Sequence, residues 1–303
     1  MTGNPITPGQ YKQYLRFVED AAERALKDTG FDKDGIQKLI ENGDEFQADI
    51  VASIRKHSLS NQFADEEVES SYAYPKGYKV KGITEQTNIL RQLFPGIGFA
   101  DEKLAEQPLP PNLPTGQAGA EGRFAIPKWQ TLVADLPAGR QVYGEAVEKV
   151  LAMIASKRKF YNYLDGELGA EYLRQHAKTA KMFQKLGDEQ KDFDILVVSA
   201  QFGLRHRGRS VRQARKVFAA NEFGLGAFAI GIMLLTHPER EVQWEQLHVD
   251  CAGDEFAPGA VGDFSSAPIF CFHDGEVEFN AGWFAYASEE YGSASGFLPA
   301  EAR

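Results

Sequence analysis

The run LGAFAIGIMLL, residues 225–235, constrains the fold most, because it offers no polar face to solvent. A helix of this length falls well short of the roughly 20 apolar residues that cross a bilayer. A helix that is apolar all round belongs in a protein core. The chain has 303 residues, 43% of them hydrophobic, and is large enough to enclose it. The run therefore predicts a central core helix, ended by His237-Pro238.

The N-terminal region, residues 1–60, is predicted to be helical. Thr7-Pro8-Gly9-Gln10 has the form of a capping box with proline at the first helical position, and Gly30 is a stop signal. Residues 36–40 and 46–54 have the apolar periodicity of shorter amphipathic helices packed on the first one. The acidic residues between these helices imitate a calcium loop, but Gly30 occupies the first ligand position. Capping of the second helix by Asp32 or Asp34 is the better interpretation.

Residues 61–142 are predicted to be a loop-rich connector, relieved by a helix over 84–93. Within it, LPTGQAG at 113–119 is echoed by LPAGRQV at 136–142, as in repeats inserted into surface loops. Residues 143–190 are predicted to form a helical pair, over 144–157 and 170–186.

Residues 191–303 are predicted to form an α+β domain. A short strand over 194–198 is followed by a helix with a second capping box at Ser210 and Gln213, and then by the core helix. Apolar residues then alternate with polar ones around Val249, and His273-Asp274-Gly275 is a hairpin signal. With a last strand over 293–298, the order is strand, helix, helix and antiparallel sheet.

This order, with FGL after the first strand and GSASGFLP near the end, resembles the C-type-lectin-like fold. The segments AQFGLRHRGRSVRQARK, NEFGLGAFAIGIMLLTHPER and HVDCAGDEFAP are similar to those of a family of bacterial proteins, a resemblance that brings no activity with it. The lectin-like resemblance implies ligand or protein recognition. It does not imply calcium-dependent sugar binding, because Pro238 lies in Thr-His-Pro-Glu and Trp283 in Gly-Trp-Phe, outside the motifs of such lectins.

Charge is distributed unevenly along a chain whose net charge is −10. Residues 157–216 carry 14 Lys and Arg against 7 Asp and Glu, whereas residues 217–303 carry 2 against 14. The favoured interpretation is that the basic segment pairs with the acidic C-terminal part. The alternative is a surface for phosphate, another anion or nucleic acid. The anion-binding candidates are Arg205, Arg207, Arg209 and Arg212, with Arg215 added for nucleic acid.

The densest group of reactive side chains lies in His248–Glu255. A cysteine nucleophile at Cys251 needs a base or cation nearby, but alternation along a strand turns His248 to the opposite face. Metal binding by His248, Asp250, Asp254 and Glu255 is a further alternative, and loop hydrogen bonds are favoured over it. Cys251 and Cys271, the only two cysteines, are expected to pack as small hydrophobes. We therefore assign no catalytic residue, no metal ligand and no cofactor.

Aromatic residues gather near the C-terminus, where tryptophan and tyrosine on strands and loops are typical of recognition surfaces. The ligand-binding candidates are Asp254, Trp283, Tyr286 and Tyr291. The expected function is a non-catalytic module of the bacterial cytoplasm that binds a protein or a small molecule. Nucleic-acid binding through the basic segment and an enzyme site at 248–255 are the alternatives. A cytoplasmic setting without membrane attachment is expected, because we find neither a leader nor a long apolar run. The sequence names no ligand, oligomeric state or biological process.

Overall fold

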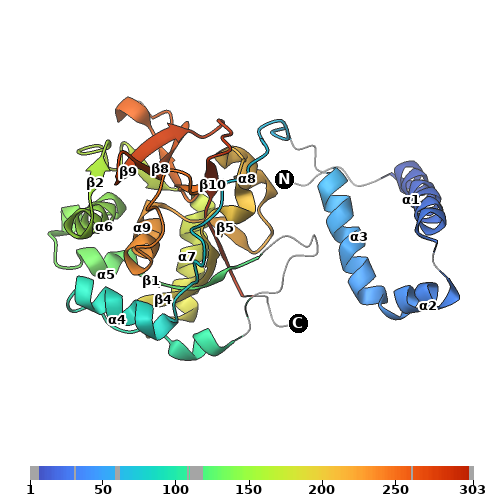
Figure 1. The fold of residues 1–303 in the computed structure, drawn as a ribbon, viewed down its shortest axis with the longest axis horizontal. Coiled ribbons are helices and arrows are strands. Elements are labelled where there is room, and N and C mark those ends of the chain that lie inside the picture. The colour runs from blue at the N-terminus through green and yellow to red at the C-terminus, as the bar shows by residue number, and fades with distance from the viewer. Residues whose placement is uncertain are drawn as a thin grey trace. The chain divides into compact units, whose positions relative to one another are not determined.

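A computed structural model describes residues 7–30, 32–58, 62–107, 109, 119–260 and 262–299. The chain divides into two compact units, Met1–Ser60 and Asn61–Arg303. The chain is a mixed α+β protein (Figure 1).

The first unit holds three helices, α1 (Pro8–Thr29), α2 (Lys33–Glu41) and α3 (Gly43–Ser58). The predicted capping box is confirmed, because the Thr7 side chain accepts from the Gln10 backbone N–H and the Gln10 side chain accepts from Thr7 N–H. Asp32 caps α2 by accepting from Gly35 N at 2.8 Å, as the capping interpretation expected. No residue of this unit with a described burial class is buried. The short helices, which were expected to pack on the first one, therefore do not enclose a core with it.

The second unit is built on two sheets. The smaller has the order β1 (Gly122–Pro127), β4 (Ile195–Gln201), β11 (Ser295–Phe297) and β5 (Glu222–Gly224), and all its pairs are antiparallel. The predicted strand at 194–198 is confirmed as part of β4, which is buried along its whole length. The predicted last strand is confirmed as β11.

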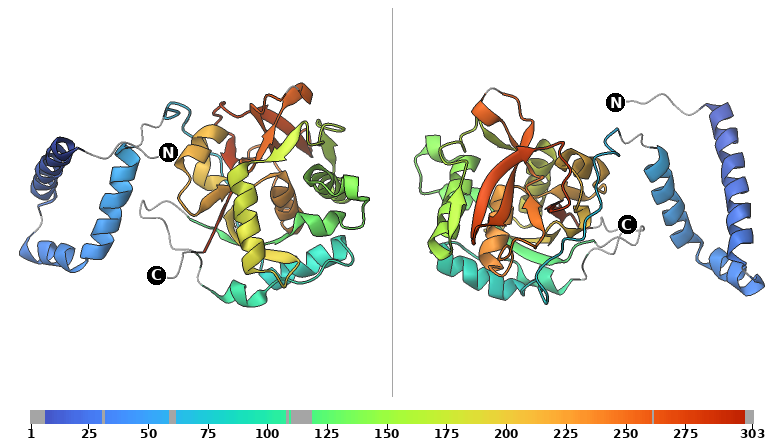
Figure 2. Two further views of the ribbon diagram at one scale, coloured as in Figure 1. Left: turned by 180° about the vertical axis from the view of Figure 1, so that it is seen from behind. Right: turned by 45° about the horizontal axis from the view of Figure 1, so that its top comes forward.

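The larger sheet follows the order β10 (Tyr291–Ser293), β6 (His248–Asp250), β8 (Ser266–His273), β7 (Asp254–Phe256) and β3 (Leu173–Gln175). Strand β9 (Glu276–Trp283) pairs with β8 and with β2 (Phe160–Asn162). Figure 2 shows the β8–β9 hairpin, in orange to red, from two further directions. Its turn confirms the hairpin predicted at residues 273–275.

The core helix is α9 (Ala227–Thr236), and every one of its residues is buried, as predicted. It contacts α6 (Tyr143–Lys157), β1 and α4 (Ile83–Leu93). The predicted stripe on α6 faces inward, since Val147, Val150, Leu151 and Ile154 are all buried. The other helical elements are η1 (Glu102–Glu106), α5 (Trp129–Val133), η2 (Ala138–Arg140), α7 (Ala177–Glu189), η3 (Leu204–His206), α8 (Val211–Val217) and η4 (Pro258–Ala260).

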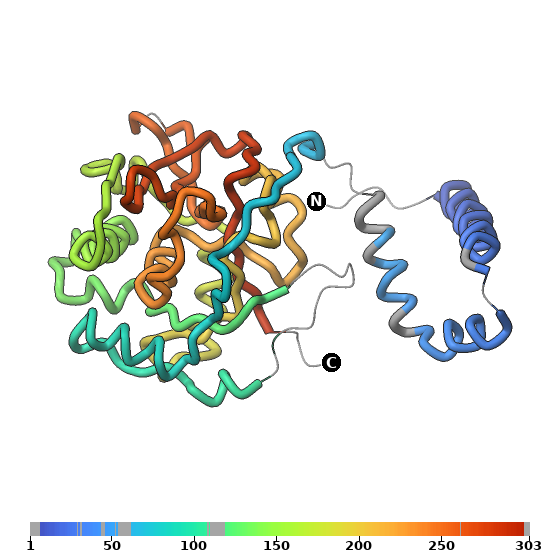
Figure 3. Tube along the Cα trace, viewed as in Figure 1, coloured from blue at the N-terminus to red at the C-terminus, as the bar shows by residue number. Residues whose placement is uncertain are grey.

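The expected connector takes part in the core instead of lying outside it. Residues 62–82, here called the crossing segment, run over the second unit toward α4 (Figure 3). Backbone hydrogen bonds anchor this segment at Val68 to Gly208 and at Ala73 to Leu247. Strand β1, which was not predicted, adds the fully buried side chains of Phe124 and Ile126.

The region after α6 and the two similar peptides differ from or extend beyond what the sequence predicted. The helix predicted over 170–186 begins later, as α7, because residues 173–175 pair with β7 and the His176 side chain accepts from Lys178 N. Of the two similar peptides, residues 113–118 lie outside the described residues, and 136–142 include η2. Within the described part of the chain, no helix is long and apolar enough to cross a membrane.

Candidate functional site

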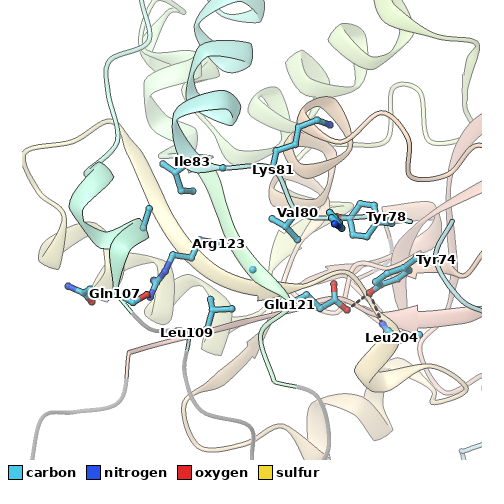
Figure 4. Close-up of a pocket in the computed structure, with 14 residues that line it drawn as sticks. Tyr74, Tyr78, Val80, Lys81, Ile83, Gln107, Leu109, Glu121, Arg123 and Leu204 are labelled. Atoms are coloured by element: carbon cyan, nitrogen blue, oxygen red, sulfur yellow. Dashed lines mark hydrogen bonds between the residues drawn. The ribbon is translucent and has the colours of Figure 1, made fainter. Parts of the chain in front are cut away.

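A pocket of about 580 Å³ lies between the crossing segment, the end of η1 and the start of β1 (Figure 4). Most of its wall is apolar or aromatic. This part of the lining consists of Tyr74, Tyr78, Val80, Ile83, Ala105, Leu109 and Leu204. Concave, mostly apolar pockets with a few fixed polar groups are where proteins hold small molecules.

Glu121 is the main polar group of the pocket. Its Oε1 accepts from the Tyr74 hydroxyl at 2.6 Å, and its Oε2 accepts from Phe202 N at 3.1 Å. Leu204 N donates in turn to the Tyr74 hydroxyl at 3.0 Å, as Figure 4 shows. Burial raises the pKa of Glu121 to about 7, although these two hydrogen bonds lower it. Near neutral pH the carboxyl group therefore changes between a neutral acid and a carboxylate.

A buried guanidinium packs against the same tyrosine. The Arg240 side chain is fully buried, with its Cζ 4.3 Å from the ring centroid of Tyr74 and 4.9 Å from that of Phe202. Nη2 donates to Leu247 O at 3.0 Å, whereas Nε and Nη1 find no partner among the described residues. The Tyr78 hydroxyl is also buried without a partner there. Such unsatisfied groups are uncommon in a protein interior, and they gather beside this pocket.

Three cationic residues line the pocket: Lys79 is exposed, whereas Lys81 and Arg123 are held by internal contacts. Lys81 Nζ donates to Glu239 at 2.8 Å and to Thr236 O at 2.9 Å. Arg123 donates to Gln107 O at 3.0 Å. The described lining contains no cysteine, serine or histidine to act as a nucleophile. The arrangement is therefore suited to binding through Glu121 more than to covalent chemistry.

The four ligand-binding candidates do not share one environment. Asp254 is fully buried, and its carboxylate accepts from Ala227 N at 2.7 Å and from the Tyr143 hydroxyl at 2.9 Å. The carboxylate therefore stabilises the buried N-terminal end of α9. Trp283 and Tyr286 are 60% and 71% exposed, whereas Tyr291 is half-buried on β10. Only Trp283 and Tyr286 have the exposure that a recognition surface needs.

The arginine side chains of the basic segment, residues 205–215, make hydrogen bonds and ion pairs with other parts of the chain. Each anion-binding candidate has an acceptor: Arg205 donates to Glu222, Arg207 to Tyr72 O, Arg209 pairs with Glu67 and Arg212 with Glu66. Arg215 donates to Ala252 O at 2.9 Å and to Asp254 O. These contacts favour the structural interpretation of the segment, and anion or nucleic-acid binding stays a prediction.

The residues proposed for an enzyme site around 248–255 do not converge. Cys251 is fully buried in the apolar core, and burial raises the pKa of its thiol well above the usual range. His248 Nδ1 lies 3.2 Å from Glu241 Oε2, while Asp254 is held by Ala227 and Tyr143. The described residues that do approach metal-ligand spacing are Cys271, His273 and Glu278.

Sequence reasoning did not find the pocket. Tyr74 and Tyr78 lie in a stretch rich in glycine and proline, which predicts loop more readily than core. Nothing marks Glu121 in the sequence, because the groups that bury it are distant along the chain. The aromatic residues within 72–78 were the one available signal.

No protein-family model matches this chain, no curated protein matches it, and no solved structure matches it.

Proposed function

We propose that the protein is a non-catalytic binding module that holds a small, partly apolar amine in the Glu121 pocket. The observation that carries this proposal is the half-buried carboxyl group of Glu121, with a pKa of about 7, in a pocket of about 580 Å³ whose wall is mainly apolar. An ammonium group next to the carboxylate would compensate the cost of burying its charge. The aliphatic and tyrosine side chains would cover the apolar body of the ligand.

A blocking substitution tests occupancy of the pocket. Ala105 lines it from an exposed position on η1, so Ala105→Trp is expected to fill the cavity without disturbing the core. Benzylamine, phenethylamine and cyclohexylamine should bind the wild-type protein in calorimetry, and Ala105→Trp should weaken this binding at least about tenfold, an expected loss of roughly 1.4 kcal/mol.

The matched control is Glu106→Trp, which adds the same ring at the next residue outside the described lining. It should bind the amines as the wild type does. Benzyl alcohol and benzoate test the ligand class, because they share the apolar body but not the cation. Equal amine binding by wild type and Ala105→Trp would refute the pocket, and preference for benzoate would refute the amine.

The affinity for these amines should depend on pH through Glu121. The ionised fraction of a group with a pKa of about 7 rises from about one-tenth at pH 6 to nine-tenths at pH 8. The apparent affinity follows that fraction, so it should rise roughly tenfold over this range. Glu121→Gln should bind weakly with a flat pH profile. A wild-type profile as flat as that of Glu121→Gln would show that the carboxylate does not hold the ligand.

Three sequence-based interpretations remain proposals. The C-type-lectin-like topology is supported by the pairing of β4 with β11, a strand close to the C-terminus. Protein binding at Trp283 and Tyr286 is supported by the exposure of both side chains. The double substitution Trp283→Ser and Tyr286→Ser should abolish capture of a protein partner. A cytoplasmic setting is supported by the unpaired state of both cysteines, and secretion of the native protein would refute it.

A further inference from the structure

A row of polar side chains crosses five strands of the larger sheet. The strand register pairs Tyr161 with Glu278, Glu278 with Cys271, and His248 with Tyr291. Extended by one residue, the β6–β8 register also sets His248 opposite Cys271. Directly opposed residues of neighbouring strands project from the same face with their side chains in reach of one another. The row therefore brings a carboxylate, a thiol and an imidazole together from three different strands.

His273 completes this group. It lies two residues after Cys271 on β8, so both side chains project from the same face. The ligand atoms of Cys271, His273 and Glu278 all lie within 4.8 Å of one another, and Cys271 Sγ is 3.8 Å from Glu278 Oε2. The indole of Trp244 packs on His273 with a centroid distance of 4.6 Å.

His248 provides an independent sign of a missing ligand. Its side chain is fully buried, and Nε2 finds no hydrogen-bond partner among the described residues. Nδ1 lies 3.2 Å from Glu241 Oε2, and the two imidazole centroids of His248 and His273 are 5.6 Å apart. Metal-binding histidines usually donate their second ring N–H to a carboxylate, which leaves the other nitrogen free for the metal. Glu241 and His248 have this arrangement.

We propose that Cys271, His273 and Glu278, with His248 Nε2 as fourth ligand, form a structural zinc site. Thiolate, imidazole and carboxylate are the donors that zinc prefers, and four protein ligands give the closed tetrahedral shell of a structural site. Zinc bond lengths place neighbouring donors roughly 3.5 Å apart. Side-chain rotations would therefore have to draw the ligand atoms of Cys271, His273 and Glu278 closer together and bring His248 Nε2 to them.

Binding would change the protonation of the thiol. Burial raises the pKa of Cys271 to about 12, although the hydrogen bond from Tyr291 lowers it, so the free thiol keeps its proton at neutral pH. Zinc would take the sulfur as a thiolate, and one proton would leave to solvent for each ion bound. The ion would then tie β6, β8 and β9 together at one point.

Cobalt substitution in the full-length protein tests this site. After treatment with a chelator, one Co²⁺ per chain should produce a thiolate-to-cobalt charge-transfer band, and Zn²⁺ should abolish it. The chain has only two cysteines, which supplies a matched pair of variants. Cys251→Ala should keep the band, because Cys251 lies in the apolar core, and Cys271→Ala should lose it.

Further variants guard against a folding defect. His273→Ala changes a half-buried residue at the hairpin end and should weaken zinc binding at least about tenfold. Glu241→Gln, which acts through His248, should weaken it by roughly 10- to 100-fold. Absence of a charge-transfer band in the wild type, its persistence in Cys271→Ala, or unchanged zinc affinity in a folded His273→Ala would each overturn the proposal.

Discussion

Glu222→Ala is expected to lower the free energy of unfolding of the second unit by about 3–5 kcal/mol, the usual cost of removing one partner from a buried ion pair. Glu222 is fully buried, and its Oε1 accepts from Arg205 Nε at 3.0 Å and from Ser295 Oγ at 2.7 Å. Oε2 accepts from Ala219 N at 3.0 Å. Without the carboxylate, the Arg205 side chain, which is only 5% exposed, would lose this ion pair in a buried position.

The same carboxylate also holds a histidine. His206 Nε2 lies 2.7 Å from Glu222 Oε1, and Arg209 Nη1 lies 3.2 Å from His206 Nδ1. Burial lowers the pKa of His206, and a neutral ring with its proton on Nε2 satisfies both contacts. Burial of Glu222 opposes its ionisation, but the contacts with His206, Arg205 and Ser295 lower its pKa to about 2. The carboxylate is thus charged at all ordinary pH values.

Glu67→Ala is the control, because it removes the partner of another arginine of the same segment. Glu67 pairs with Arg209 at 2.8 Å but is 42% exposed, so its loss should cost less than about 1 kcal/mol. Urea unfolding of both variants measures the difference. If Glu222→Ala were as stable as Glu67→Ala, Arg205 would be able to reach solvent, and the anion-binding hypothesis would gain support.

In the basic segment, the local helix cap could be predicted from the sequence, but most of the ion-pair partners could not. One half of the capping box predicted at Ser210 and Gln213 is confirmed, since the Ser210 side chain accepts from Gln213 N at 3.1 Å. This cap could be predicted because it depends on residues close in sequence. Pairing with the acidic C-terminal part is confirmed for Arg205 and Glu222. Two other partners, Glu66 and Glu67, come from the crossing segment, which was expected to be part of a connector. Pairs so distant in sequence leave no local pattern.

The core helix could be predicted from local sequence, whereas the pocket could not. The burial of α9 could be predicted because its composition admits no other environment. The environment of the Glu121 carboxyl group could not be predicted, because Tyr74 and Phe202, which donate hydrogen bonds to it, lie 47 and 81 residues away along the chain. Asp254 was taken for a ligand-binding residue because residues 248–256 were expected to form a loop that meets the ligand. Only the fold shows that its carboxylate accepts from the first residue of α9.

Asp254→Ala is expected to destabilise the second unit by about 3 kcal/mol, because it leaves two buried donors, Ala227 N–H and the Tyr143 hydroxyl, without their acceptor. Asp254→Asn should cost less than about 1 kcal/mol, since its amide oxygen can accept from Ala227 and its NH₂ can donate to the Tyr143 oxygen. Glu255→Ala is the neighbouring control. It removes a pair with Arg174, whose side chain is 54% exposed, so it should also cost less than about 1 kcal/mol.

The pH dependence of stability separates this structural role from a ligand-binding one. Burial raises the pKa of Asp254 to about 7, whereas a carboxyl group of this type in the unfolded chain titrates near 3.8. Between these values the folded state binds the proton more tightly, so the contribution of Asp254 to stability is largest at low pH and falls as the pH rises toward 7. Asp254→Asn should flatten this fall in urea unfolding, leaving the share that comes from Glu121 and Asp250, whose pKa values burial also raises to about 7. An unchanged slope would mean that Asp254 is already ionised in the fold. Wild-type stability of Asp254→Ala together with lost ligand capture would restore Asp254 to the binding surface that the sequence suggested.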